Sequence, residues 1–263
     1  TWTGSSVMDH PPHGGTNIVA FDGRGPKADE LAGRRHAHTD RSIREGMGTA
    51  AVAFDLDDTL AVTRVDRATL LETTLREVGA PQRSRQAYLQ AHAENLTARS
   101  REPVFERLFD GEDIDAAAVA QAYRDRVNAA LEPVPGVEDM LASLRGRYRL
   151  GLLTNGPVVA QRSKLAALGW TDTFDAALVT GELAAGKPES AAFESLLTEL
   201  DTDASETVFV GNDVTADVQG AVAAGIDAVQ VCYSDGPARD PDAFAHVERD
   251  ELAERLPTIL AER

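Results

Sequence analysis

From residue 50 onward the chain alternates apolar runs with stretches of helical periodicity, and this alternation limits the possible folds most strongly. The run AVAFDL at residues 51–56 is apolar up to its acidic end, which is typical of a strand buried on both faces of a parallel sheet. Similar runs follow at residues 149–154, 176–180, 207–211 and 228–232. Helical patterns separate these later runs, at residues 137–147, 161–169, 190–200 and 216–225. We therefore predict an α/β fold with a doubly wound parallel sheet.

The stretch from residue 66 to about residue 132 interrupts this alternation and contains no convincing strand. Its apolar residues recur at helical spacing within residues 67–79, 84–98, 102–109 and 115–131. We predict a small α-helical domain at residues 66–133. It is inserted into a core formed by residues 49–65 and 134–263.

Residues 1–48 differ in composition from the rest of the chain. They are rich in Gly, Pro, His and charged residues and have no sustained apolar period, so we predict a disordered N-terminal extension. The irregular spacing of its histidines favours a solvated tail over a metal site; these are His10, His13, His36 and His38. We interpret Met47, just ahead of the first strand, as the native start.

The overall charge of the chain argues against several partners. A formal net charge of −17 disfavours nucleic acid, because an acidic surface repels phosphate backbones. The sequence has neither an apolar run long enough to span a membrane nor the apolar core of a secretory signal, so we expect a cytoplasmic protein. Cys232, the single cysteine, lies in an apolar run and is expected to be a buried strand residue.

The basic residues are strongly biased towards arginine. Only three lysines occur, Lys27, Lys164 and Lys187, whereas Asp, Glu and Ala are abundant. This balance indicates adaptation to high salt or a GC-rich genome, which the sequence does not separate. A lysine at a conspicuous position is therefore informative.

Residues suited to ligand binding follow four of the predicted strands, where ligands of such sheets bind. In chain order they are Asp55, Asp57 and Thr59, then Thr154, Asn155 and Gly156, then Lys187, and finally Asn212, Asp213 and Asp217. Asp55, Asp57 and Asp58 form a cluster of like charge. Two carboxylates about 4 Å apart repel each other by roughly 4 kcal/mol at an effective dielectric constant near 20, so we expect a cation or a proton there.

These residues, in this order, resemble the four motifs of the haloacid dehalogenase superfamily. Asp55, Asp57 and Thr59 match the first motif, Asp-x-Asp-x-Thr, and Thr154 matches the second. Lys187 in GKP matches the third motif, and GNDVTAD matches the acidic fourth. The resemblance covers about residues 50–235 and implies a Rossmann-like core, with the helical segment as a cap between the first and second motifs.

One position departs from the family pattern and bears on the metal site. Asn212 stands where many members have an aspartate directly after the glycine. We favour Asp213 as the metal ligand, because a dication prefers a carboxylate to a neutral amide.

The site residues suggest phosphoryl transfer in two displacements. Asp55 is expected to act as the nucleophile and form an aspartyl phosphate. We expect Mg²⁺ to be held by Asp55, the backbone carbonyl of Asp57 and Asp213. Lys187 would add fixed positive charge.

The remaining roles concern substrate binding and proton transfer. Thr154 and Asn155 are expected to donate hydrogen bonds to phosphate oxygens, and Gly156 is assigned to substrate binding with them. Asp57 would protonate the leaving oxygen and later deprotonate water, so part of its population must be protonated when substrate binds.

The leading hypothesis is therefore a magnesium-dependent hydrolase of a small-molecule phosphate monoester. A 2-haloacid dehalogenase is disfavoured because Asp57 supplies an acid that carbon–halogen cleavage does not need. A phosphomutase of the same fold remains open. A phospho-receiver domain fits poorly with the long helical insertion, and a degenerate binding domain fits poorly with the retained motif residues.

Several further residues have open assignments. We expect Asp58 to be a turn residue, and Asp217 to be either a plain helix residue or a partner that orients Lys187 or the metal ligands. Arg99, Arg101 and Arg107 could reach a second anionic group on the substrate, although surface salt bridges are the commoner fate of arginines. The identity of the substrate, a small phosphorylated metabolite, and the oligomeric state are not readable from the sequence.

Overall fold

The computed structural model describes residues 48–95 and 97–263. The predictions made for residues 1–47, including the disordered extension, its histidines and the start at Met47, lie outside the described residues.

A six-stranded parallel sheet forms the centre of the described chain, with strand order β5-β4-β1-β6-β7-β8. Its strands are β1 (Ala51–Phe54), β4 (Arg149–Thr154), β5 (Ala176–Val179), β6 (Thr207–Gly211), β7 (Asp227–Cys232) and β8 (Ala245–Glu248). The five strands expected from apolar runs are confirmed. Sequence reasoning missed β8, because this short edge strand is only partly buried and lacks a continuous apolar run.

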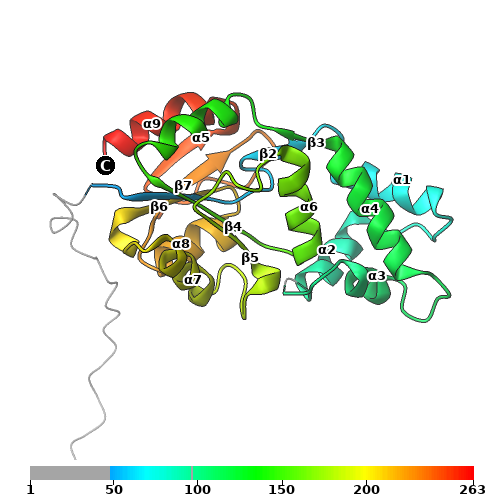
Figure 1. Cartoon of the computed structure of the whole chain (residues 1–263). Coiled ribbons are helices and arrows are strands. Elements are labelled where there is room, and N and C mark those ends of the chain that lie inside the picture. Colours follow the sequence, from blue (N-terminus) through cyan, green and yellow to red (C-terminus); the bar gives the residue numbers. More distant parts are fainter. Residues whose placement is uncertain (1–47, 96) are drawn as a thin grey trace, which may run out of the picture. The chain divides into compact units, whose positions relative to one another are not determined.

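Helices cover both faces of the sheet, which confirms the doubly wound fold (Figure 1). Helices α5 (Val137–Arg145) and α9 (Leu252–Ala261) lie on one face. The opposite face carries α7 (Ser190–Leu200) and α8 (Gly220–Ala223), and α6 (Val158–Leu168) lies between the sheet and the helices α1 to α4. Short helical turns complete this part: η2 (Thr180–Glu182), η3 (Ala204–Glu206), the π-helix η4 (Val214–Gln219) and η5 (Arg249–Glu251).

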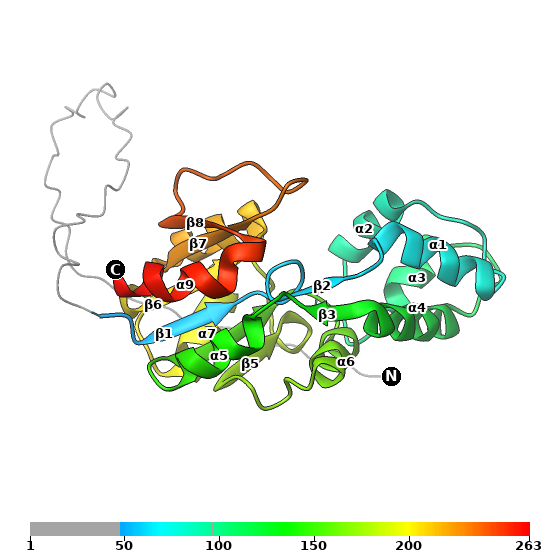
Figure 2. The same cartoon turned by 90° about the horizontal axis from the view of Figure 1, so that it is seen from above.

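Four helices form the segment that follows the first strand, and we call residues 67–130 the helical insertion (Figure 2). They are α1 (Arg67–Glu77), α2 (Arg85–Ala93), α3 (Glu102–Leu108) and α4 (Ala116–Ala130). Asp66, Ser84 and Asp115 each accept a backbone N–H at the start of a helix, as N-cap residues do. The insertion has its own apolar cluster, in which the rings of Phe105 and Tyr123 meet edge to face.

The prediction that this region contains no strand is wrong at its end. Strand β3 (Leu131–Pro133) pairs in antiparallel fashion with β2 (Ala61–Thr63), so the chain enters and leaves the insertion through a two-stranded ribbon. Three-residue strands are too short to show a period of two, and only the pairing of segments far apart in sequence defines them.

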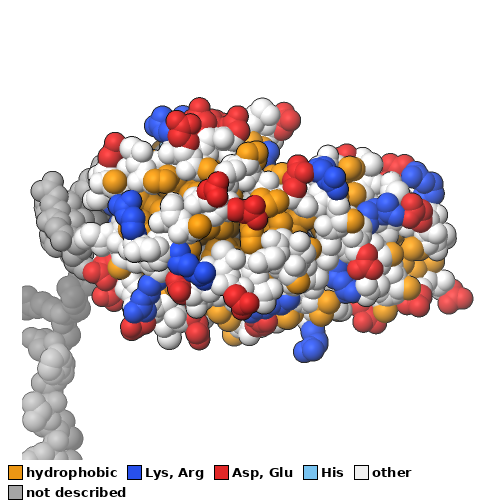
Figure 3. All heavy atoms as spheres, turned by 45° about the horizontal axis from the view of Figure 1, so that its top comes forward, with side chains coloured by type: hydrophobic (Ala, Val, Ile, Leu, Met, Phe, Trp, Pro, Cys, Tyr) orange, Lys and Arg blue, Asp and Glu red, His pale blue; other side chains and the backbone are white. Residues whose placement is uncertain are grey.

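Three features of the core and the surface bear on the expectations from composition. Cys232 is buried in β7 as predicted. None of the described helices combines the length and apolar character that crossing a membrane requires. On the face shown in Figure 3, acidic and basic side chains of the described residues are interspersed, without an extended basic patch.

Candidate active site

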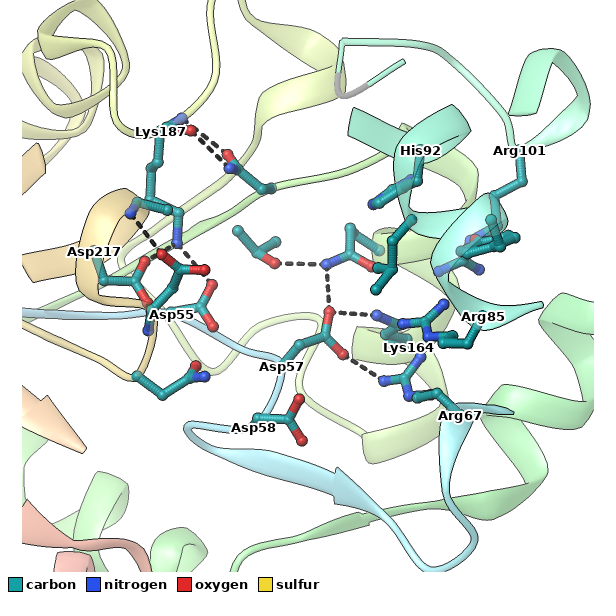
Figure 4. A pocket seen from close by; sticks show the side chains of 18 of the residues that line it. Asp55, Asp57, Asp58, Arg67, Arg85, His92, Arg101, Lys164, Lys187 and Asp217 are labelled. Carbon is teal, nitrogen blue, oxygen red and sulfur yellow. Dashed lines mark hydrogen bonds and ion pairs between the residues drawn. The ribbon is translucent and has the colours of Figure 1, made fainter. Parts of the chain in front are cut away.

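A pocket of about 270 Å³ lies where the carboxyl ends of β1, β4 and β6 face the helical insertion (Figure 4). Of the residues assigned catalytic, substrate-binding or metal roles from the sequence, all line this pocket except Gly156. The lining from the sheet side includes Asp55, Asp57, Thr154, Asn155, Lys187, Asn212, Asp213 and Asp217. The insertion contributes Arg67, Arg85, Tyr88, Leu89, His92, Arg101 and Tyr123, and α6 contributes Gln161 and Lys164.

Lys187 links two buried carboxylates at the sheet end of the pocket. Its Nζ lies 2.7 Å from Asp55 Oδ1 and 2.6 Å from Asp217 Oδ1, and all three side chains are buried. Burial raises the pKa of Asp55 to about 7; Lys187 opposes this shift, and the neighbouring charges of Asp217 and Asp57 add to it. Asp217 therefore takes the second of its two predicted roles, as a partner of Lys187.

The π-helical turn after β6 places Asp217 next to Lys187. Asp213 begins this turn as its N-cap residue, with its Oδ1 2.7 Å from the N–H of Ala216. The backbone N–H of Asp213 in turn donates to Asp217 Oδ2 at 2.9 Å. A Cβ atom at Gly211 would lie 2.5 Å from the Asp217 side chain, so the close approach of Asp217 to the end of β6 requires glycine there.

Asn155 fixes the backbone of Lys187 through two hydrogen bonds. Its Nδ2 donates to the Lys187 carbonyl and its Oδ1 accepts from the Lys187 N–H, both at 2.9 Å. One Nδ2 hydrogen remains for a ligand, because an amide has two. Gly156 does not line the pocket, and its N–H donates to Thr180 Oγ1 at 3.0 Å. The structure therefore does not bring Gly156 together with the other predicted substrate-binding residues.

Asp57 is surrounded by donors. Arg67 Nη2 lies 2.7 Å from its Oδ1, while Oδ2 accepts from Lys164 Nζ and, at 2.9 Å, from Gln161 Nε2. Burial raises the pKa of Asp57, but the positive charges of Lys164 and Arg67 outweigh it and hold the pKa well below its usual range. These cations therefore favour the ionised form of Asp57, and the partial protonation expected for a general acid requires a substrate that separates Asp57 from them.

Gln161 and Lys164 were not predicted as site residues. Gln161 donates to Thr154 Oγ1 at 2.5 Å as well as to Asp57, so it connects the ends of β1 and β4. Burial lowers the pKa of Lys164 to about 7, although Asp57 pulls it the other way. The scarcity of lysine was a usable signal, since both lysines of the described chain line this pocket.

The loop between β1 and β2 contains Asp58 and Thr59. Asp58 has a φ of 61° and lies in a turn, as predicted. Thr59 Oγ1 donates to Asn212 Oδ1 at 3.0 Å and so joins the first motif to the fourth.

The donor set of the pocket fits a divalent cation. Asp55 and Asp217 contact Lys187 and Asp213 lines the same pocket, so the carboxylates at the sheet end outnumber this lysine. No group of three or more His, Cys, Asp or Glu side chains in the described residues is arranged as a metal site. The expected set needs only two carboxylates and one backbone carbonyl, and Mg²⁺ commonly binds through one or two carboxylates together with water and phosphate.

The three arginines proposed for a second anionic group have different fates. Arg101 is buried and lines the pocket. Arg107 lies on the outside of α3, 3.3 Å from Glu94, and Arg99 is not among the lining residues.

Comparison with known proteins identifies the family. The family model described as haloacid dehalogenase-like hydrolase matches residues 52–231. A glyceraldehyde 3-phosphate phosphatase from Methanopyrus kandleri is 31% identical over 226 residues, which cover 80% of this chain and 96% of that protein. A ribulose-1,5-bisphosphate 5-phosphatase from Halopiger xanaduensis is 34% identical over 136 residues, but these span 51% of this chain and 55% of that protein.

The fold comparison agrees with the sequence comparisons. A magnesium-bound HAD hydrolase from Bacillus subtilis has a TM-score of 0.64 at 22% identity, with 81% of this chain and 99% of that chain covered. This likeness confirms the Rossmann-like α/β core. The chain belongs to the haloacid dehalogenase-like hydrolase family, as its motifs predicted, and the expected hydrolase class is confirmed.

Proposed function

We propose that this chain is a magnesium-dependent phosphatase that hydrolyses a small-molecule phosphate monoester through an aspartyl-phosphate intermediate. The phosphatase names of its relatives from Methanopyrus kandleri and Halopiger xanaduensis support phosphate-ester hydrolysis. The observation that carries the proposal is the contact between Asp55 and Lys187, which places a buried carboxylate against a fixed positive charge at the end of β1.

In this proposal, the side chains of the sheet end share the tasks of attack, phosphate binding and metal binding. Asp55 uses its Oδ2 for attack on phosphorus, because Oδ1 is held by Lys187. The Thr154 hydroxyl accepts from Gln161 and keeps its own hydrogen for a phosphate oxygen. Asp55, the carbonyl of Asp57 and Asp213 would hold Mg²⁺, which supplies charge compensation for the anionic phosphate.

Asp57 moves the protons in this scheme. It protonates the leaving oxygen of the substrate and then removes a proton from the water that hydrolyses the phosphorylated Asp55. Proton uptake requires the substrate to draw Lys164 or Arg67 away from Asp57, because both cations favour its ionised form.

The presence of Asp57 also favours this function over 2-haloacid dehalogenation, which has no leaving alkoxide to protonate. A phosphomutase would use the same nucleophile and differs in the acceptor. The small volume of the pocket supports a small-molecule substrate.

The test is hydrolysis of an aryl phosphate with and without Mg²⁺ by wild-type protein and by Asp55→Asn. We expect the substitution to lower kcat by more than about a thousandfold, since it removes the nucleophile. The matched control is Asp201→Asn, at an exposed aspartate that pairs only weakly with Arg149. Activity that survives Asp55→Asn, or the chelation of metal, would contradict the mechanism.

A further inference from the structure

The insertion side of the pocket holds several hydrogen-bond donors without partners. Arg101 Nε and Nη1, Arg85 Nη1 and the Tyr123 hydroxyl are buried and form no hydrogen bond within the described part of the chain. All three side chains line the same pocket. Buried polar groups in folded proteins nearly always have partners, so this cluster is incomplete without a ligand.

Charge at this end of the pocket is also uncompensated. Arg67 and Lys164 pair with Asp57, whereas Arg85 and Arg101 form no ion pair with any carboxylate among the described residues. The chain as a whole carries a net charge of −17, so the lack of an acidic partner for these two arginines does not reflect a shortage of carboxylates in the sequence. Burial of an unpaired guanidinium is costly, and an anionic ligand removes that cost.

Contacts with α6 and with the Tyr123 ring position Arg101. The two residues before Ser100 are tied to the start of α6, because Val158 N–H donates to the Ala98 carbonyl at 3.2 Å and Val159 N–H to the Arg99 carbonyl at 2.9 Å. The Arg101 guanidinium lies over the Tyr123 ring, 5.5 Å from its centre. The ring supports the flat face of the guanidinium, while two of its three nitrogens have no hydrogen-bond partner.

The unpartnered arginines and the proposed reaction centre lie at opposite ends of one pocket. In Figure 4, Asp55, Lys187 and Asp217 lie at one end and Arg85 and Arg101 at the other, with Asp57 and Lys164 between them. A ligand with an anionic group at each end matches this arrangement.

We propose that Arg101, together with Arg85 and the Tyr123 hydroxyl, binds a second anionic group of the substrate, a carboxylate or a second phosphate. The planar guanidinium fork suits both groups, which present paired oxygens. The proposal rests on the proposed phosphatase function and narrows its substrate class to small phosphate monoesters that carry a further negative charge.

The kinetic test compares three-carbon phosphate monoesters that differ at the far end, with a carboxylate, a second phosphate or a hydroxyl. Wild-type protein should have a higher kcat/KM for at least one of the two charged esters than for the hydroxyl ester. The ratio of kcat/KM for the charged ester to kcat/KM for the hydroxyl ester measures this preference. Arg101→Gln should lower the ratio about 10- to 100-fold, the range expected for loss of a hydrogen bond to a charged group. Which charged ester loses more identifies the second group as carboxylate or phosphate.

Arg107→Gln is the matched control, because Arg107 lies nearby on α3 but is exposed and outside the pocket. It should leave the ratio as in the wild type. Should Arg101→Gln fail to fold, Arg85→Gln and Tyr123→Phe provide the same test. A wild-type ratio near one, or equal losses for charged and hydroxyl esters, would overturn the proposal.

A binding measurement separates this proposal from the phosphatase assignment. Calorimetry would use a three-carbon phosphonate that carries a carboxylate and cannot be hydrolysed, with the hydroxyl analogue as reference. Tighter binding of the carboxylate form by wild-type protein, lost in Arg101→Gln, supports the subsite even if no ester is hydrolysed. Hydrolysis of esters without any such difference in binding would refute the subsite and leave the phosphatase function standing.

Discussion

Asp217 Oδ1 lies 2.6 Å from Lys187 Nζ, and both side chains are almost completely buried. Strand β6 and the π-helical turn η4 position Asp217, and the chain after β5 positions Lys187. Asp217 thereby orients the lysine that contacts Asp55, while its own Oδ2 holds the backbone of Asp213.

Asp217→Asn should weaken this arrangement. The amide keeps the shape but removes the negative charge, so we expect the free energy of unfolding to fall by about 1–3 kcal/mol and kcat to fall as Lys187 shifts. Urea denaturation and phosphatase assays measure the two effects. Asp201→Asn, the same change at an exposed residue, should alter neither. Equal effects of the two substitutions would show that the buried contact is unimportant.

Asp57→Asn should affect esters according to their leaving groups. A general acid contributes about 10²–10⁴-fold, and an aryl oxide needs protonation less than an alkoxide does. We therefore expect kcat to fall much more for an alkyl phosphate than for an aryl phosphate, as steady-state kinetics with both substrates would show. A uniform loss on all esters would assign Asp57 a structural role with Arg67 and Lys164.

The choice of metal ligand at the fourth motif can be tested by Mg²⁺ titration of activity. Asp213→Asn preserves the N-cap, because asparagine caps helices as well as aspartate does, but it removes the carboxylate proposed to bind metal. The Mg²⁺ concentration for half-maximal activity should rise at least about tenfold. Asn212→Ala, which removes the contact with Thr59, should change it much less. The reverse order would assign the metal to Asn212.

Gly211→Ala should destabilise the protein through a specific collision. The added Cβ would lie 2.5 Å from the Asp217 side chain, and forced overpacking costs about 1–3 kcal/mol. Gly146→Ala is the control, since no heavy atom lies within 4 Å of a Cβ there. Thermal unfolding should show a lower Tm for the first variant only. An unchanged Tm for Gly211→Ala would mean that η4 moves without cost.

His92 should make stability depend on pH. Burial and the nearby charges of Arg101, Lys164 and Arg85 lower its pKa to about 3. The unfolded state therefore binds more protons than the folded state between the folded pKa and the usual value near 6.5, so stability falls as pH decreases through that range. Between about pH 7 and 4.5, wild-type protein should lose more stability than His92→Gln in urea denaturation. Parallel losses would show that His92 becomes protonated in the folded state.

The sequence by itself determined the class of fold and the centre of the site. Apolar runs and helical periods defined β1, β4, β5, β6 and β7, and parallel strands must bring their carboxyl ends to one edge of the sheet. The meeting of Asp55, Thr154 and Lys187 followed from that rule, without knowledge of any helix packing.

Tertiary structure decided what surrounds that centre. Gln161, Lys164 and Arg101 lie on α6 and at the start of α3, where sequence periodicity does not say which helix faces meet or how the insertion packs against the core. The ribbon of β2 and β3 and the edge strand β8 likewise exist only through pairing across long stretches of chain. Local pattern specifies an element when the residues of that element carry the signal. The partners of Asp57 and the unpartnered nitrogens of Arg101 depend instead on distances between elements, which only the folded chain defines.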